Sequence, residues 1–120
     1  GIKAFYTFFQ NNNNNYAHKY LIIGFESTKI IFKALNKLIE LFDSIIITET
    51  QVKSSMTAQL LYQEAKHKDK VTINVDAYES ITKIKNIMKE NDILVILGSH
   101  YFGNTLNKIF KNCFDNQYKA

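Results

Sequence analysis

The sequence predicts a single α/β domain with an open, mainly parallel sheet in three layers and helices on both of its faces. Two observations lead to this fold class. Short continuous apolar segments alternate along the chain with longer segments in which apolar residues recur at helical spacing, a pattern typical of buried parallel strands joined by helices. In addition, 46% of the 120 residues are apolar, which suffices for one core covered on two sides. We therefore expect residues 1–120 to form one domain.

The alternation predicts the element order αβαβαβαβα. A first helix at residues 2–10 precedes an asparagine tract that has no apolar side chain to bury and is expected to be a loop. The predicted strands are residues 20–24, 44–48, 71–75 and 93–97, and the other predicted helices are residues 28–42, 54–66, 77–90 and 102–114. Because crossover helices join parallel strands with right-handed connections, the expected architecture is Rossmann-like.

Apolar residues at helical spacing mark the helix faces that should pack on the sheet. These residues are Ile31, Leu35, Leu38 and Phe42 in the second helix, Met56, Leu60 and Leu61 in the third, and Ile81, Ile84 and Met88 in the fourth.

The composition argues against nucleic-acid and membrane partners. The net charge is +4 and the pI is about 9.1, but the lysines are scattered along the helical segments and arginine is absent. A nucleic-acid interface needs clustered basic residues. The apolar runs are strand-sized, shorter than the roughly 20 residues that span a bilayer. The first residues show no basic segment followed by an apolar one. We expect a cytoplasmic protein.

Neither a disulfide nor a metal site is expected. Cys113 is the single cysteine, so it has no partner within the chain. The three histidines, His18, His67 and His100, show no metal-ligand spacing with one another or with Cys113.

In a parallel α/β sheet, ligands bind beyond the carboxyl ends of the strands. The corresponding stretches are residues 24–29, 49–55 and 98–103, together with Asp76. Gly98 is followed by Ser99, whose hydroxyl either caps the next helix or helps to hold an anion.

Lys29 also follows a strand, in the first turn of its predicted helix, where a cation opposes the helix dipole. It is either a solvated lysine or a ligand contact. After the second strand come Lys53, Ser54 and Ser55, which either bind an anion or cap the next helix. The sequence contains no glycine-rich phosphate loop and no Ser-His-acid set, so we assign no catalytic residue and expect the chain not to be a complete enzyme.

Three runs carry a family resemblance: residues 20–29 (YLIIGFESTK), 42–48 (FDSIIIT) and 92–99 (DILVILGS). Together they resemble the C-terminal domain of folylpolyglutamate synthase/dihydrofolate synthase, the third module of the Mur ligase superfamily. The most specific elements are the strand that ends in Gly98-Ser99 and leads into a helix, and Gly24 followed five residues later by Lys29. The likeness covers nearly the whole chain.

The resemblance implies a part of an ATP- and Mg-dependent ligase that joins L-glutamate to a folate or dihydropteroate carboxylate through an acyl phosphate. ATP and Mg would be bound mainly by a central ATPase domain of the same chain. By the same resemblance, Lys29 and Ser99 would contact the glutamate carboxylates or the phosphate, Gly98 would permit close approach, and His100 is a further candidate.

The sequence also departs from the family pattern. Thr28-Lys29 replaces an Asp-Lys pair, and Val52-Lys53 replaces a Pro-Arg step whose planar guanidinium lysine does not reproduce. The family's first strand, Asp-Gly-Ala-His-Asn, would come just before Gly1. The resemblance therefore implies a fragment that lacks the first family strand and is inactive by itself.

Two other functions remain open from the residues alone. A free-standing α/β binding or interaction module explains the missing catalytic residues without a larger ligase. A response-regulator-like receiver would need a carboxylate cluster at a strand end, and Asp76 is the single aspartate so placed.

Overall fold

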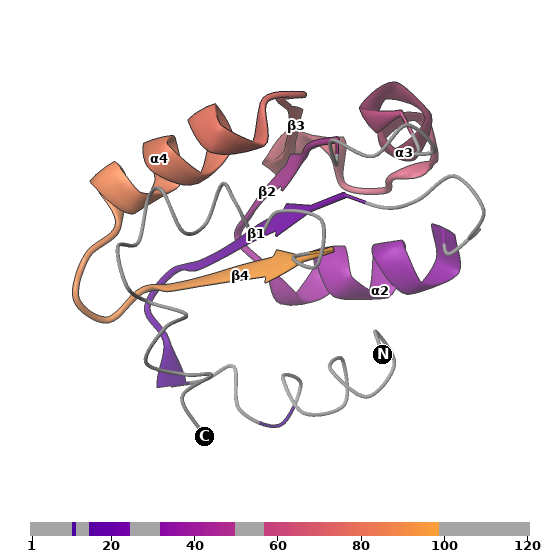
Figure 1. Ribbon diagram of the computed structural model, residues 1–120. Coiled ribbons are helices and arrows are strands. Elements are labelled where there is room, and N and C mark those ends of the chain that lie inside the picture. Colours follow the sequence, from indigo (N-terminus) through magenta and orange to yellow (C-terminus); the bar gives the residue numbers. More distant parts are fainter. Residues whose placement is uncertain (1–10, 12–14, 25–31, 50–56, 99–120) are drawn as a thin grey trace, which may run out of the picture.

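A computed structural model describes residues 11, 15–24, 32–49 and 57–98 of the chain (Figure 1). The elements are, in order, β1 (Lys19–Ile23), α2 (Phe32–Leu41), β2 (Ser44–Ile47), α3 (Ala58–Glu64), the short 3-10 helix η2 (Lys68–Lys70), β3 (Val71–Ile73), α4 (Ala77–Ile87) and β4 (Ile93–Leu97). The predicted helices at residues 2–10 and 102–114 lie outside the described residues.

The four strands form one sheet in the order β3-β2-β1-β4, and every pair in it is parallel. The register places Ile22 of β1 between Ile46 of β2 and Ile96 of β4. Because neighbouring parallel strands cannot be joined by a tight turn, each connection crosses a face of the sheet. The predicted open parallel α/β sheet is confirmed.

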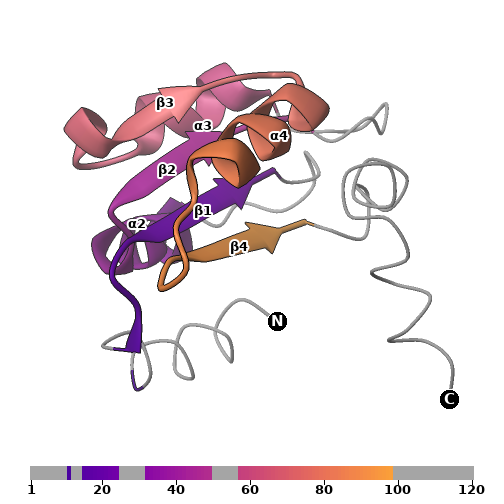
Figure 2. The same cartoon turned by 90° about the vertical axis from the view of Figure 1, so that its left-hand side faces the viewer.

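Helices cover both faces of the sheet, as Figures 1 and 2 show. Alternate strand residues such as Leu21 and Ile45 pack with Leu35, Leu38 and other residues of α2 and α3 in one buried cluster. The intervening strand residues pack with α4 in a second cluster, which consists of Tyr20, Ile22, Ile46, Ala77, Ile81 and Ile84. The sheet is therefore the middle of three layers, as the apolar strand sequences predict.

Successive strands are added first on one side of β1 and then on the other. From β1 it passes outward through β2 to β3, and α4 then returns it to the other side of β1 as β4. Among the described strands, the order is consequently reversed between β1 and β4. In open α/β sheets this topological switch point opens a crevice for ligands.

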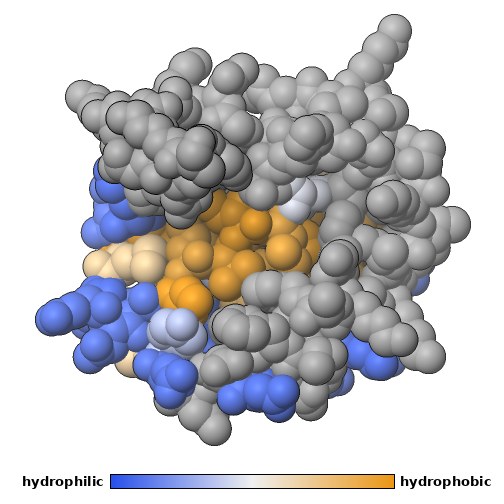
Figure 3. All heavy atoms as spheres, turned by 60° about the horizontal axis from the view of Figure 1, so that its bottom comes forward, coloured by the Kyte–Doolittle hydropathy of each residue, from blue (hydrophilic) through white to orange (hydrophobic). Residues whose placement is uncertain are grey.

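The β4 strand borders the sheet on that side. Among the described strands it pairs with β1 alone, and all five of its apolar residues are partly exposed. Figure 3 views the molecule from below and shows apolar side chains at the surface of this face.

Several predicted boundaries and one predicted core residue are wrong. The first strand lies one residue earlier, β3 ends at Ile73, and Val75 beyond it is 58% exposed. Likewise α4 ends at Ile87, because Met88 is already extended. Leu60 is 43% exposed, whereas its neighbour Leu61 is fully buried. Since α3 turns its Ala58 and Leu61 toward the sheet, a residue one step away from Leu61 points outward.

Candidate functional site

The carboxyl ends of the strands are aligned by hydrogen bonds that continue one residue past each strand. The amide of Gly24 donates to the carbonyl oxygen of Leu97 (3.3 Å), and the amide of Thr48 donates to that of Ile23 (2.9 Å). These bonds extend the sheet register, so Gly98, Gly24 and Thr48 form a row across three neighbouring strands. We call these three residues the switch-point row.

Two residues of the switch-point row have no side chain. Gly98 has a φ of 87°, in the left-handed region that disfavours residues with a Cβ atom. Gly24 is buried in the row beside it. Two adjacent glycines at the ends of β1 and β4 allow a ligand to approach the backbone closely.

The third residue, Thr48, is polar and fully buried (0% exposed). Its Oγ1 atom has no hydrogen-bond partner among the described residues. Buried hydroxyls are usually paired, so this atom is a hydrogen-bonding group left available at the switch point.

The polar residues that follow Thr48 stabilise α3. A carboxylate oxygen of Glu49 accepts a 2.9 Å hydrogen bond from the amide of Ala58, the first residue of α3. The hydroxyl of Thr57 caps the same helix by accepting from the amide of Leu60. A carboxylate at a helix N-terminus also interacts favourably with the helix dipole. The carboxylate of Glu49 is therefore already engaged with the first residue of α3.

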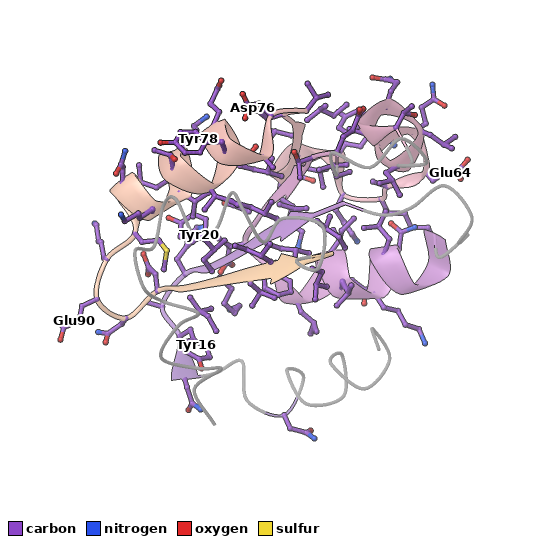
Figure 4. The ribbon with its side chains drawn as sticks, in the orientation of Figure 1. Tyr16, Tyr20, Glu64, Asp76, Tyr78 and Glu90 are labelled. Carbon is purple, nitrogen blue, oxygen red and sulfur yellow. The ribbon has the colours of Figure 1, made fainter. Side chains whose placement is uncertain are left out.

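The polar residues after β3 are likewise engaged in a helix start. Asp76 caps α4 by accepting a 3.0 Å hydrogen bond from the amide of Glu79, and Asn74 accepts one of 3.0 Å from the amide of Asp76. Figure 4 shows Asp76 at the beginning of α4. Ser80 donates to the carbonyl oxygen of Asp76 at 2.8 Å. The predicted site residue Asp76 thus has a capping role, which also argues against a receiver domain.

Of the residues predicted to bind ligand, Gly98 lies at the switch point as expected. Lys29, Ser99 and His100 lie outside the described residues, as do residues 50–56. Lys29 and Ser99 follow the switch-point glycines in sequence by five residues and one residue. Within residues 15–24, 32–49 and 57–98, no three His, Cys, Asp or Glu side chains are grouped to hold a metal ion. No helix in this part of the chain is long and apolar enough to cross a membrane.

A polar cluster that the sequence analysis missed lies at the opposite end of the sheet, where the strands begin. Nε2 of His18 lies 3.0 Å from Oγ of Ser44, and the rings of His18 and Tyr20 are 4.3 Å apart between centroids. Figure 4 shows Tyr16 and Tyr20 at this end. The described residues place no carboxylate in hydrogen-bond contact with the His18 ring, so the pair lacks the acid of a hydrolytic triad.

The amino-end cluster also perturbs Tyr20. Burial raises the pKa of the Tyr20 phenol, and the carboxylates of Asp92 and Asp43 raise it further. Asp43 itself is held by Lys19, whose amide donates to it at 2.9 Å and whose ammonium group lies 3.5 Å away. These contacts join β1 to the start of β2, and we assign them a structural role.

Comparison with known proteins relates this fold to folate ligases. No protein-family model matches the chain, and no curated protein matches its sequence significantly. Among solved structures, E. coli FolC in complex with DHPP and ADP superposes with a TM-score of 0.72 and 14% identity, over 97% of this chain and 26% of that one. Folylpolyglutamate synthase of Mycobacterium tuberculosis, complexed with ADP and AMPPCP, superposes with a TM-score of 0.66 and 15% identity, over 92% of this chain and 28% of that one.

A bifunctional folylpolyglutamate synthase/dihydrofolate synthase with Mn, AMPPNP and L-glutamate bound gives a TM-score of 0.72 and 15% identity, over 90% of this chain and 26% of that one. The chain shares its fold with part of these enzymes. It spans about a quarter of their length. The resemblance inferred from the three sequence runs is thereby confirmed at the level of fold.

Proposed function

We propose that this chain is the C-terminal, glutamate-side domain of an ATP-dependent folate ligase. Such an enzyme joins L-glutamate to a folate or dihydropteroate carboxylate through an acyl phosphate. The observation that carries the proposal is the superposition on folylpolyglutamate synthase and dihydrofolate synthase structures over most of this chain. The sequence runs that contain Gly24 and Gly98 support the same family independently.

The switch-point row provides the place for the ligand. Gly24 and Gly98 lie side by side at the ends of β1 and β4 without side chains, and the two predicted contact residues follow them closely in sequence. Lys29 and Ser99 would contact the carboxylates of the amino acid or the phosphate charge, and His100 is a further candidate. By the family resemblance, ATP and its metal would be bound mainly by the remainder of the enzyme.

The first test is the coding sequence upstream of the Gly1 codon. The proposal expects an open frame that continues through an Asp-Gly-Ala-His-Asn strand to a phosphate-binding loop. A start codon or an unrelated domain at that place would instead favour a free-standing binding module.

The second test is kinetic and uses the full-length product of that frame. We expect Lys29→Ala and Ser99→Ala each to raise the KM for L-glutamate about tenfold or more, because a hydrogen bond to a charged group contributes roughly 1.5–3 kcal/mol. The KM for ATP should change little. Lys83→Ala, an exposed lysine on α4, serves as the control. An equal rise in both KM values would contradict a glutamate-side role. ATP-dependent glutamate ligation by the isolated chain would contradict the expectation that the chain is inactive by itself.

A further inference from the structure

The hydroxyl of Thr48 needs an explanation that the fold does not supply. Thr48 is fully buried, and its Oγ1 atom has no partner among the described residues. A buried hydroxyl without a hydrogen bond lowers the stability of a folded protein. A valine of the same shape would avoid this loss. We take the unpaired hydroxyl of Thr48 as a candidate hydrogen-bonding group for a bound molecule.

The position of Thr48 indicates where that molecule would lie. The amide of Thr48 still follows the sheet register by donating to Ile23, so side-chain alternation holds through this residue. Thr48 therefore shares the face of Ile46, which packs against α4. Gly24 and then Gly98 are its neighbours along the switch-point row. Since adjacent strands lie about 4.8 Å apart, Thr48 lies one strand spacing from Gly24 and two from Gly98.

We propose that Thr48 is a substrate-positioning residue, whose hydroxyl donates a hydrogen bond to an anionic oxygen bound at the switch-point row. This inference rests on the proposed function and adds a residue to its site. The anionic oxygen belongs to a carboxylate of L-glutamate or to a phosphate. Both are acceptors that a hydroxyl donor satisfies while the adjacent glycines leave room for them.

A second threonine provides a matched control. Oγ1 of Thr82 is also buried and has no partner among the described residues. Thr82, however, lies within α4 and away from the strand ends that form the switch-point row. Thr48→Val and Thr82→Val make the same chemical change, and both replacements are β-branched.

The experiment compares the wild-type chain with Thr48→Val and Thr82→Val in two measurements. Urea denaturation gives the unfolding midpoint, and NMR titration gives the affinity for L-glutamate and, separately, for inorganic phosphate. We expect both variants to unfold at a urea concentration equal to or higher than the wild type does, because an unpaired hydroxyl has been removed. Thr48→Val should bind about tenfold more weakly than the wild type, whereas Thr82→Val should bind equally well. The probe whose affinity falls identifies the source of the anionic oxygen.

Three results would overturn the inference. If Thr48→Val binds as tightly as Thr82→Val, Thr48 does not position the ligand, although the proposed function stands. If Thr48→Val unfolds at a clearly lower urea concentration than the wild type, the hydroxyl is paired within the fold. If the wild-type chain binds neither L-glutamate nor phosphate, the inference is rejected, whereas the proposed function is decided separately by the upstream coding sequence and by the kinetics of the full-length enzyme.

Discussion

The amide of Gly24 donates a hydrogen bond to the carbonyl oxygen of Leu97, so the carboxyl end of β1 is attached to the residue that precedes Gly98. This bond extends the register of β1 and β4 by one residue, so that Gly24 lies opposite Gly98 at the topological switch point. The residue after this bond, Gly98, adopts a positive φ of 87°.

Gly98→Ala should lower the free energy of unfolding by about 1–2 kcal/mol, because an L-residue with a Cβ atom is strained in the left-handed region. Gly98→Asn should cost less, since asparagine tolerates this region better than alanine does. Urea denaturation of the two variants and the wild type measures both effects. Equal stability of Gly98→Ala and the wild type would show that the positive φ is not required.

The side chain of Asn36 joins α2 to the end of α3. Its Nδ2 donates to the carbonyl oxygen of Glu64 at 3.1 Å, and its Oδ1 accepts from the amide of Lys66 at 2.6 Å. Asn36→Ala should lower the free energy of unfolding by about 1–2 kcal/mol through the loss of both bonds. Asn86→Ala, an exposed asparagine near the end of α4, controls for helix propensity. The prediction fails if thermal unfolding ranks the two variants equally.

Tyr20 should make stability depend on pH in the alkaline range. Burial, with Asp92 and Asp43, raises the pKa of its phenol in the folded protein, so the folded state keeps this proton after the unfolded chain has lost it. Its contribution to stability is complete below about pH 10, the pKa of an unperturbed tyrosine, and falls as the pH rises above that value.

Denaturant titrations between about pH 9 and 11 compare the wild type with Tyr20→Phe across the range in which an unperturbed tyrosine titrates. The two proteins differ only in the phenolic hydroxyl, so the difference between the two slopes reports on Tyr20. The wild type should lose stability more steeply. Parallel curves would show that the Tyr20 phenol titrates alike in the folded and unfolded states.

Glu49 should contribute to stability through its bond to the amide of Ala58 at the start of α3. Glu49→Ala removes the acceptor and the charge and should lower the free energy of unfolding by about 1–2 kcal/mol. Glu49→Gln keeps an acceptor oxygen and should lose less. Glu40→Ala, an exposed residue of α2, is the control. A Glu49→Ala variant as stable as the Glu40→Ala variant would exclude this role, and urea unfolding midpoints decide between them.

The strands were predictable because their apolar runs are continuous and the segments between them have helical spacing. The end of β3 was misplaced although the sequence contains its cause. Asn74 accepts a hydrogen bond from the amide of Asp76, and Asp76 caps α4. Such side-chain bonds compete with continuation of a strand, so an Asn two residues before an Asp signals a turn.

The position of the candidate site was predictable from the sequence, whereas the contacts between its side chains were less so. Strand ends with glycine indicate the crevice, and parallel topology brings Gly24 and Gly98 together there. The contact between His18 and Ser44 depends on the register of two strands, which a single sequence does not specify. The unpaired hydroxyl of Thr48 similarly follows from what surrounds it in three dimensions.

The return of the chain through α4 has a consequence for the order of folding. In the register of β1 and β4, residue 19 lies opposite residue 93, so this pairing closes a far longer loop than the pairing of β1 with β2. Contacts between residues distant in sequence form slowly, because the entropy of loop closure opposes them until much of the structure is in place. The pairing of β1 with β4 is thus expected to be among the last parts to assemble, and a chain that has folded only through β3 has not yet brought Gly98 beside Gly24.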